Sequence, residues 1–295
     1  MNEPLVTVAM PFYNCERTLE AAIQSILDQT YGNFELILCN DGSTDGSAEI
    51  VASFHDARIK LITHSDRARL AVRLNECIDN ARGYYFARMD ADDISYPDRI
   101  EKQVRFLEQH SDIDLVGTQM LVFQGGGNPV GKIQGPTQHE ELVSRALLGI
   151  RVWHATWLGK RSWFQAHRYD PRCALAQDQE LLFRAHKVSA YAVIPELLYG
   201  NRVDALHLKK MLWYRVLWMR YMSWHLRGFA GYLKRIGLGC LLLGKAAVDT
   251  FAMTTGLQYK ILRHRANPLS RSEIVGWEPI RRKFFATGAV RQSNV

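Results

Sequence analysis

A short acidic segment at the end of an apolar run is the part of the sequence best suited to chemistry. The apolar residues 84–89 lead into Asp90, Ala91, Asp92 and Asp93, so three carboxylates fall within four positions. If the run is a buried strand, these carboxylates lie at the carboxyl edge of a sheet, where open α/β sheets bind ligands. Oxygen ligands without a neighbouring Cys or His favour Mg2+ or Mn2+, and such an ion suits a diphosphate. The alternative is a loop that only caps the next helix.

Two earlier loops are expected at the same edge, because each also follows an apolar strand pattern. The first contains Pro11, Tyr13 and Asn14 and would offer backbone groups and an aromatic ring to a nucleobase. The second contains Asp41, which can accept hydrogen bonds from a base or ribose, and Gly42, which permits a tight turn. Each loop alone could be an ordinary helix cap. The three loops together predict a nucleotide site.

Alternating strand and helix patterns would bring these loops together. Strand patterns at residues 5–10, 34–39, 59–63 and 84–89 alternate with helical patterns at 18–29, 48–54, 70–81 and 97–109. Short connections between them predict a mostly parallel, doubly wound α/β sheet. After residue 112 the alternation weakens, residues 125–129 predict a hairpin turn, and residues 152–158 are expected to be extended. This part should complete the sheet and form the other wall of a cleft.

Charge is distributed unevenly along the 295 residues. Residues 1–199 carry 20 basic and 26 acidic side chains, whereas residues 200–295 carry 17 basic and 4 acidic ones. From about residue 205 the chain also has a helical pattern rich in Trp, Tyr and Leu, which favours a membrane surface. Residues 236–257 are long enough to cross a bilayer. Their two charges and four glycines favour a helix that lies in the membrane plane or re-enters the membrane instead, and packing inside the domain is the alternative.

The cysteines and the N-terminus bear on the cellular compartment. Five cysteines, at positions 15, 39, 77, 173 and 240, form no CxxC pair, which argues against a disulfide scaffold or a zinc site and fits a reducing compartment. The first residues do not form a signal-peptide pattern, and no nucleic-acid-binding motif accompanies the basic residues. We expect a cytoplasmic protein, peripheral on the inner face of the cell membrane, that binds no nucleic acid.

These segments together resemble the inverting glycosyltransferases of family 2, which have the GT-A fold. The resemblance runs almost continuously over residues 1–110, and its matching segments are 6–14, 25–31, 34–37, 41–45, 81–83, 89–94 and 97–100. It implies a GT-A-type, Rossmann-like sheet with flanking helices over residues 1–204. Residues 1–110 would be the nucleotide-binding half and residues 111–204 the acceptor half. A helical, membrane-associating region would follow at 205–265, and a polar tail at 266–295.

The resemblance implies a nucleotide-sugar donor, with a UDP-sugar favoured, and roles for individual residues. Those that would hold the nucleoside are Pro11, Tyr13, Asn14 and Asp41. Asp90 would contact the ribose or the surroundings of the metal, and Asp92 would bind Mg2+ or Mn2+. Asp93 would be a second ligand or a helix cap. Three arginines, at 67, 69 and 73, are expected near this edge, at least two of them solvated.

Inversion in one displacement requires a general base for the acceptor hydroxyl. Asp178 and Glu180 are the candidates, and the Glu-Asp pattern of the family aligns Asp178 with the base, although Gln177 replaces the family's Glu. His154 lies in a segment similar to a His-Pro-Thr segment of the family and is expected on the acceptor side. Arg202 lies in a segment similar to Tyr-Arg-Val and would reach the diphosphate.

The expected function is metal-dependent, inverting transfer of a single sugar to a hydroxyl of a lipid-linked glycan, in polysaccharide biosynthesis. The chain lacks a Gln-x-x-Arg-Trp segment and a set of spanning helices, which disfavours a processive synthase. One alternative is a non-catalytic, membrane-bound scaffold that binds nucleotide sugars, suggested by Gln177 and Ala155. Another is a nucleotidyltransferase, disfavoured because the loop after the first strand is neither Gly-rich nor basic.

Overall fold

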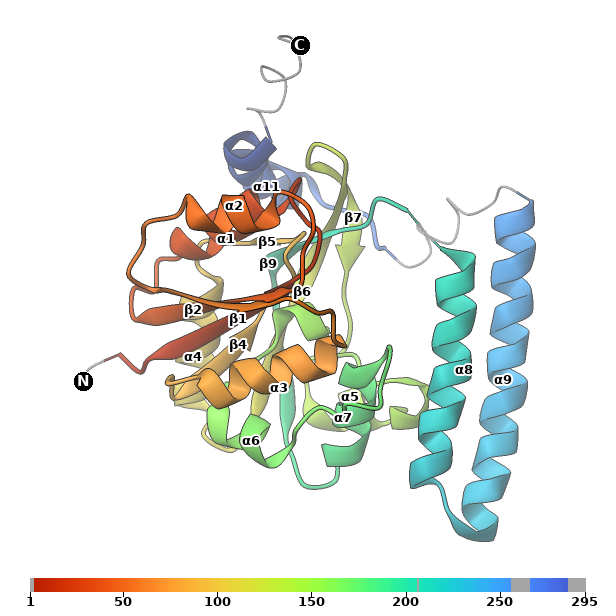
Figure 1. Cartoon of the computed structure of the whole chain (residues 1–295). Coiled ribbons are helices and arrows are strands. Elements are labelled where there is room, and N and C mark those ends of the chain that lie inside the picture. The colour runs from red at the N-terminus through yellow and green to blue at the C-terminus, as the bar shows by residue number, and fades with distance from the viewer. Residues whose placement is uncertain (1–2, 206, 256–265, 286–295) are drawn as a thin grey trace.

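The structure is a computed structural model that describes residues 3–205, 207–255 and 266–285. Its centre is a nine-stranded sheet with the order β3-β2-β1-β4-β8-β6-β9-β5, in which β7 pairs with β6 (Figure 1). The strands are β1 (Val6–Phe12), β2 (Phe34–Asp41), β3 (Ile59–His64), β4 (Tyr85–Arg88), β5 (Ile94–Ser95), β6 (Leu115–Gln124), β7 (Asn128–Ile133), β8 (Leu158–Lys160) and β9 (Tyr191–Arg202).

The parallel half of the sheet consists of β1, β2, β3 and β4. β1 pairs in parallel with both β2 and β4, and β3 adds in parallel to β2. Every residue of β2 and of β4 is buried, as expected for strands covered on both faces. The predicted doubly wound arrangement is confirmed. Because the strands are parallel, the loops that follow β1, β2 and β4 all leave the sheet at one edge.

The second half of the sheet is mixed. β8 pairs antiparallel with β4 and β6, β9 runs parallel to β6, and β6 and β7 form the predicted hairpin. The expectation of an extended segment at residues 152–158 is wrong, because a 3-10 turn, η2 (His154–Thr156), precedes the short β8. The Thr156 hydroxyl donates to the carbonyl of Trp153 (2.8 Å) and accepts from the amide of Thr118 (3.1 Å). Such local bonds from Thr compete with a strand ladder.

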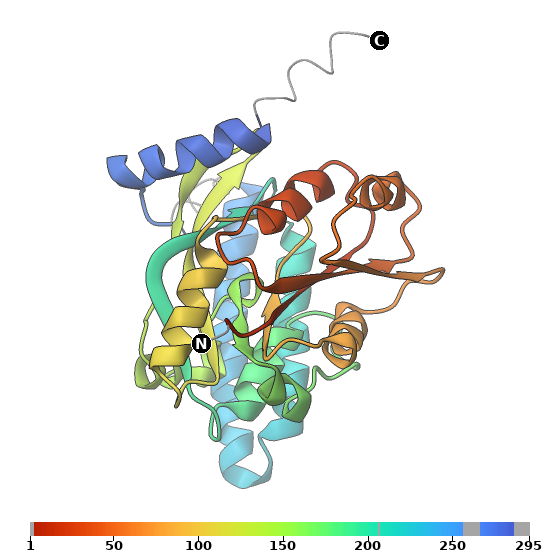
Figure 2. The same cartoon turned by 90° about the vertical axis from the view of Figure 1, so that its left-hand side faces the viewer.

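Helices cover both faces of the sheet (Figures 1 and 2). Their bounds are α1 (Leu19–Leu27), α2 (Ser47–Ala52), α3 (Leu70–Asn80), α4 (Arg99–Gln109), α5 (His139–Val143), η1 (Ala146–Leu148), α6 (Arg161–Ala166) and α7 (Gln177–Ala185). Apolar residues of α1, α2 and α4 share one core with the sheet. Those of α3, α5, α6 and α7 share the core on the opposite face. The two layers fix the strands whose loops carry the acidic residues.

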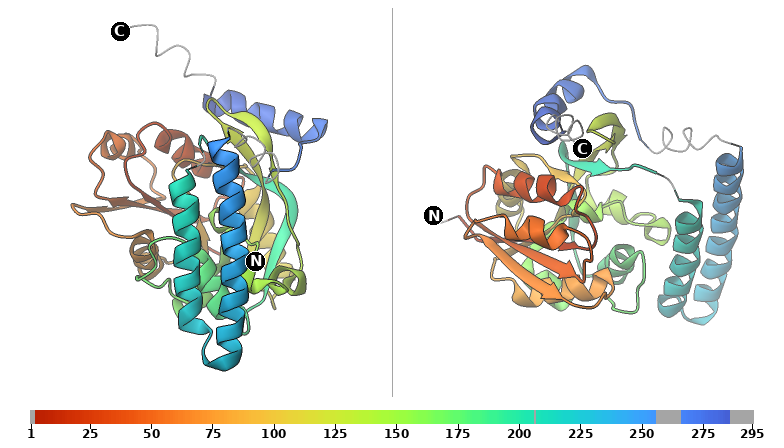
Figure 3. Two further views of the ribbon diagram at one scale, coloured as in Figure 1. Left: turned by 90° about the vertical axis from the view of Figure 1, so that its right-hand side faces the viewer. Right: turned by 45° about the horizontal axis from the view of Figure 1, so that its top comes forward.

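A helical hairpin stands beside this domain, formed by α8 (Leu208–His225) and α9 (Gly228–Thr254) (Figures 1 and 3). α8 packs on residues 173–176 through Leu217, Trp218 and Tyr221. α9 packs against α8. Among the described residues, α9 is the one helix long and apolar enough to cross a membrane, and only 17% of its most apolar window is buried. This exposure disfavours packing inside the domain. Residues 256–265 of the expected membrane-associating region lie outside the described residues.

The polar tail expected at residues 266–295 contains a helix, α11 (Arg271–Phe285), that packs back onto the sheet. Trp277 is fully buried against Phe123 and donates its indole N–H to the carbonyl of Gly127 at 2.8 Å. Lys132 of β7 forms an ion pair with Glu273 at 2.7 Å. The prediction missed this helix because many charged residues and Pro279 obscure a short apolar stripe. Residues 286–295 lie outside the described residues.

Candidate active site

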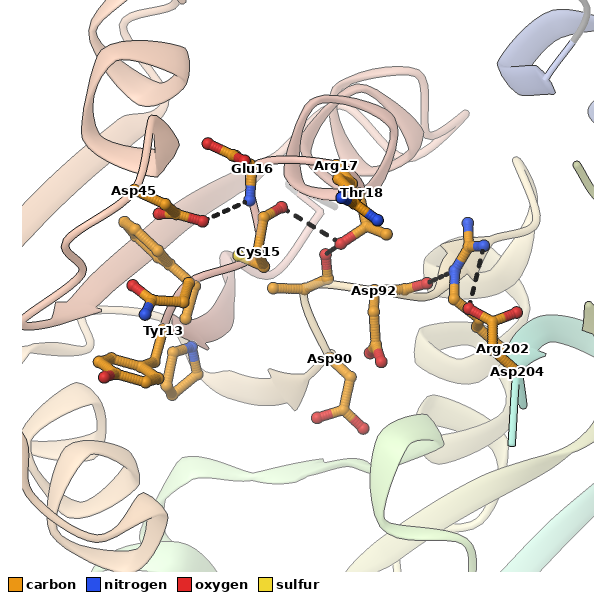
Figure 4. A pocket seen from close by; sticks show the side chains of 14 residues that line it. Tyr13, Cys15, Glu16, Arg17, Thr18, Asp45, Asp90, Asp92, Arg202 and Asp204 are labelled. Carbon is orange, nitrogen blue, oxygen red and sulfur yellow. Dashed lines mark hydrogen bonds and ion pairs between the residues drawn. The ribbon is translucent and has the colours of Figure 1, made fainter. Parts of the chain in front are cut away.

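A pocket of about 490 Å3 lies at the edge where β1 and β4 end (Figure 4). Its walls are residues 11–18, Asp45, residues 90–92, Arg202 and Asp204. The pocket therefore brings together Pro11, Tyr13, Asn14, Asp90, Asp92 and Arg202 from the predicted site. Asp41, Asp93, His154 and Asp178 do not line it and are described separately below.

Asp90, Asp92 and Asp93 form an acidic cluster directly after β4. One carboxylate oxygen from each lies within 4.8 Å of the others. Asp92 is exposed to the pocket. Partial loss of its hydration there, followed by the negative charge of Asp90, raises the pKa of Asp92 to about 6. Burial, with Asp92 and Asp90 next to it, raises the pKa of Asp93 well above its usual range. A divalent cation would relieve this crowding, and the oxygen-only donor set fits Mg2+ or Mn2+.

The three acids differ in their surroundings. Asp93 is buried and accepts hydrogen bonds from the backbone amide of Arg202 (2.7 Å) and the side-chain amide of Asn201 (3.2 Å). Asp93 therefore ties the acidic loop to the end of β9. Asp90 and Asp92 project from the same loop toward the open part of the pocket in Figure 4. Of the three, Asp92 is the carboxylate most accessible to a ligand.

A buried arginine that the sequence reasoning did not single out holds Asp90. Arg88, the last residue of β4, donates both terminal nitrogens to the two Asp90 oxygens, one of them at 2.6 Å. Its side chain is only 4% exposed, and its Nε has no hydrogen-bond partner. Arg99 donates to the Arg88 carbonyl at 3.3 Å. A charged residue at the end of an apolar strand, just before an acidic segment, was the available signal.

Asp178 lies in the first turn of α7. Ala176, the residue just before α7, has a positive φ of 57°, a costly conformation for a residue with a side chain. The Gln179 side chain holds the start of α7 against Ile150: it accepts from the Ile150 amide (2.8 Å) and donates to the Ile150 carbonyl (3.1 Å). Burial raises the pKa of Asp178, while the charge of Arg88 lowers it. Asp178 and Asp90 thus share Arg88 as an electrostatic neighbour.

Glu180, the other candidate base, is committed to structural contacts. It is 1% exposed and accepts hydrogen bonds from Arg184 (3.0 Å) and from His225 of α8 (2.9 Å). Burial alone would raise its pKa, but these two partners lower it. Glu180 therefore joins α7 to the helical hairpin rather than facing a substrate.

The predicted nucleoside residues connect the loops after β1 and β2. The Asn14 side chain accepts from the Thr44 amide at 2.8 Å, and the Asn14 backbone adopts a positive φ of 47°. Tyr13 lies under the guanidinium of Arg67, 4.1 Å from the ring centre. Pro11 continues β1 and lines the pocket. The Tyr13 ring at the pocket wall and the Arg67 guanidinium over it form a surface on which a base can stack.

Asp41 stabilises the loop that precedes α3 by accepting hydrogen bonds. One of its oxygens accepts from the amide of Ala68 (2.7 Å) and from Nε of Arg73 (2.6 Å). Arg73 is itself buried, whereas Arg67 and Arg69 are exposed, as expected for two of the three arginines. Asp41 thus orders the residues that carry Arg67.

His154 lies near Arg88, whereas Arg202 lies next to Asp92. His154 is hydrogen-bonded to the Tyr169 hydroxyl at 2.8 Å, and burial followed by the charge of Arg88 lowers its pKa well below the usual value. It is therefore a neutral group near Asp178. Arg202 donates to the carbonyls of Asp92 and Gly125, each at 3.0 Å. Its guanidinium lines the pocket beside Asp204 (Figure 4).

Comparison with solved structures identifies the fold. The structure of Staphylococcus aureus TarS 1-349 superposes with a TM-score of 0.61 at 16% identity, covering 93% of this chain and 78% of that chain. A mannosyltransferase from Pyrobaculum calidifontis, solved with GDP-Man and Mn2+, gives a TM-score of 0.60 at 17% identity, covering 98% of this chain and 87% of that one. Both share the GT-A type of architecture.

Sequence comparison identifies the family. EpsE of Bacillus subtilis (strain 168), which carries a provisional assignment as a glycosyltransferase, is 54% identical over 214 residues, or 70% of this chain and 76% of that protein. An Escherichia coli UDP-Glc:alpha-D-GlcNAc-diphosphoundecaprenol beta-1,3-glucosyltransferase is 35% identical over 136 residues, or 46% of this chain and 53% of that protein. The family description "Glycosyl transferase family 2" matches residues 7–168. The chain belongs to glycosyltransferase family 2 and is an enzyme that transfers a sugar from a nucleotide sugar.

Proposed function

We propose that the enzyme transfers one sugar from a nucleoside-diphosphate sugar to an acceptor hydroxyl, with inversion and with a divalent metal. The observation that carries the proposal is the cluster of Asp90, Asp92 and Asp93 beside the pocket, with Arg88 bonded to Asp90 and its charge acting on Asp178. This arrangement provides a metal-binding side for the leaving diphosphate and a separate carboxylate for the acceptor. It favours catalysis over the non-catalytic scaffold, and membership of the family argues against nucleotidyl transfer.

The donor side is proposed to comprise the loops after β1, β2 and β4. Tyr13 and Arg67 would stack on the base, Pro11 and Asn14 would shape the wall around it, and Asp41 would position the loop. Asp92 and Asp93, beside Asp90, would hold Mg2+ or Mn2+, which would stabilise negative charge on the departing diphosphate. TarS has been solved with UDP-GlcNAc and the P. calidifontis mannosyltransferase with GDP-Man and Mn2+. We favour UDP as the nucleotide.

On the acceptor side, Asp178 is proposed to remove the proton from the attacking hydroxyl. A single displacement inverts the anomeric centre, because the nucleophile enters opposite the leaving group. Burial raises the pKa of Asp178, which makes the carboxylate a stronger base than an exposed aspartate. The neutral His154 and the Tyr169 hydroxyl lie in the same region. They would orient the acceptor through hydrogen bonds.

We further propose that the acceptor is a lipid-linked glycan presented at the cytoplasmic face of a membrane. α8 packs against Cys173 and Ala176, just before α7, and its His225 is hydrogen-bonded to Glu180 of α7 at 2.9 Å. The hairpin therefore lies next to the proposed base. Its α9 exposes large apolar side chains such as Phe229, Leu243 and Phe251. The E. coli relative named above acts on a diphosphoundecaprenol-linked sugar.

The membrane proposal predicts binding to anionic vesicles through α9. We expect the full chain to co-sediment with phosphatidylglycerol-containing vesicles. Replacing Phe229, Leu243 and Phe251 with serine should weaken binding at least about tenfold, because each loses apolar surface worth about 1.5–3 kcal/mol when buried. The matched control is Val188→Ser, which removes an apolar side chain that is 74% exposed on the main domain. Equal binding by the triple variant and this control would contradict the proposal.

Donor hydrolysis tests the proposed reaction without knowledge of the acceptor. Purified full-length protein would be incubated with Mn2+ or Mg2+ and a panel of UDP-, GDP- and dTDP-sugars, and nucleotide release would be followed over hours. We expect slow release from one donor that stops when the metal is chelated. A protein that binds no nucleotide in the presence of metal would contradict the proposed reaction.

A further inference from the structure

A second group of metal-binding side chains lies away from the acidic pocket, on the face of the sheet covered by α3. Cys39 is on β2, His64 ends β3 and Glu76 is on α3, and one ligand atom from each lies within 4.8 Å of the others. Cys39 and His64 share this face because the register pairs His64 with Asp41, two residues beyond Cys39. Three separate elements thus deliver a thiol, an imidazole and a carboxylate to one point.

The contacts within this group are close to those of a tetrahedral metal site. The Cys39 sulfur is 3.9 Å from a Glu76 oxygen, and Nε2 of His64 is 2.8 Å from the same oxygen. Ligands placed about 2.0–2.3 Å from a tetrahedral Zn2+ are separated by about 3.3–3.6 Å. Movements of about half an ångström in flexible side chains would therefore accommodate the ion.

Access and charge also permit a cation at this point. Cys39 is fully buried, but the side chains of His64 and Glu76 are 23% and 28% exposed, so an ion can enter from their side. Arg73 is 3.5 Å from Glu76, but it also pairs with Asp41 at 2.6 Å and donates to the carbonyl of Asp66 at 2.8 Å. The charge of Arg73 is therefore already balanced without Glu76. Arg73 contacts the same Glu76 oxygen that lies near Cys39 and His64, so an ion bound to that oxygen replaces this one long contact and leaves the other two partners of Arg73 in place.

We propose that Cys39, His64 and Glu76 form a binding site for a thiophilic divalent cation of the Zn2+ type. Thiolate and imidazole ligands select such an ion over Mg2+ or Mn2+, which distinguishes this site from the oxygen-only cluster of Asp90, Asp92 and Asp93. Solvent completes the coordination on the exposed side. The bound ion clamps β2, β3 and α3 together, and on binding it displaces the proton of the Cys39 thiol.

The absence of a CxxC pair excludes only a zinc site whose ligands are close together in the sequence. Cys39, His64 and Glu76 are brought together by the parallel pairing of β2 with β3 and by the packing of α3 over them. The buried Cys77 lies next to Cys39 as well, since a hydrogen bond between the two thiols, together with burial, raises the pKa of Cys77. Spacing along the chain could not reveal this assembly.

Cobalt spectroscopy on the full-length protein tests the site independently of sugar transfer. Co2+ added to the reduced, metal-free protein is expected to give the charge-transfer absorption of a cobalt–thiolate bond. Zn2+ is expected to remove this absorption by competition and to raise the Tm, because it binds only the folded state. Cys39→Val should abolish the absorption. His64→Gln and Glu76→Gln should each weaken Co2+ binding at least about 100-fold, since even the loss of an outer-shell partner costs about 10–100-fold.

Two control variants separate this site from other thiols and from the acidic pocket. Cys240→Ser removes an exposed thiol on α9 and should leave the absorption unchanged. Asp92→Ala should also leave it unchanged, so this test succeeds or fails separately from the proposed reaction. Absence of the absorption in the unaltered protein overturns the proposal. So does an absorption that survives in Cys39→Val, or one that survives unweakened in the partly exposed His64→Gln and Glu76→Gln variants.

Discussion

Asp92→Ala is expected to reduce metal-stimulated nucleotide release by at least about 10³-fold, while the protein stays folded. A metal that stabilises the leaving diphosphate contributes several kcal/mol, and each 1.36 kcal/mol changes the rate tenfold. The Asp92 side chain is exposed, and Arg202 contacts its carbonyl rather than its carboxylate. Its removal should therefore not disturb the loop. Release rates across a Mn2+ titration, with the Tm recorded for each protein, check this expectation.

The matched control for Asp92 is Asp204→Ala. Asp204 is an exposed acid in the same pocket, 3.7 Å from Arg202, but it is not part of the acidic cluster. The control variant should keep most of the release activity and an unchanged dependence on Mn2+. If Asp92→Ala instead releases nucleotide as fast as Asp204→Ala does, Asp92 is not the metal ligand.

The elements that carry the donor side could be predicted from the sequence because they depend on local signals. One apolar strand pattern followed by Asp90, and another followed by Asp41, predict both the strands and the edge of the sheet where they finish. Parallel pairing then brings the loops together without further information. The predicted fold class is confirmed by the sheet order and by the structural neighbours.

Partners far apart in sequence could not be predicted in the same way. Asp178 and Glu180 lie two residues apart on one helix, and only the packing of α8 shows that His225 pairs with Glu180. Arg88 ends its strand just before the acidic segment, but the sequence does not show which of the three carboxylates it pairs with. α11 was missed because its contacts, such as those of Trp277 with β6 and Tyr96, are with residues far away in the sequence.

The roles of Asp178 and Glu180 are separable because the two carboxylates have opposite surroundings. Glu180→Gln weakens the contacts to Arg184 and His225, so we expect a lower Tm but sugar transfer by the folded fraction. Asp178→Asn keeps the shape of the side chain and removes the base. General-base catalysis contributes about 10²–10⁴-fold, so transfer should fall by that factor while nucleotide binding is retained. Transfer assays and nucleotide titrations on both variants measure these effects.

The pH dependence of Asp178 provides an independent test of the same role. Its pKa is raised in the folded protein, so the folded state holds this proton more tightly than the unfolded state, and ionised Asp178 lowers stability at neutral pH. That loss of stability disappears as the pH falls through the raised pKa, whereas catalysis is lost over the same interval because the base becomes protonated. Asp178→Asn should therefore have a Tm equal to or above that of the parent protein at neutral pH, and its residual transfer should lack the acidic limb of the profile. If Asp178→Asn transfers sugar at a near-normal rate with that limb intact, while Glu180→Gln is inactive when folded, the base is Glu180.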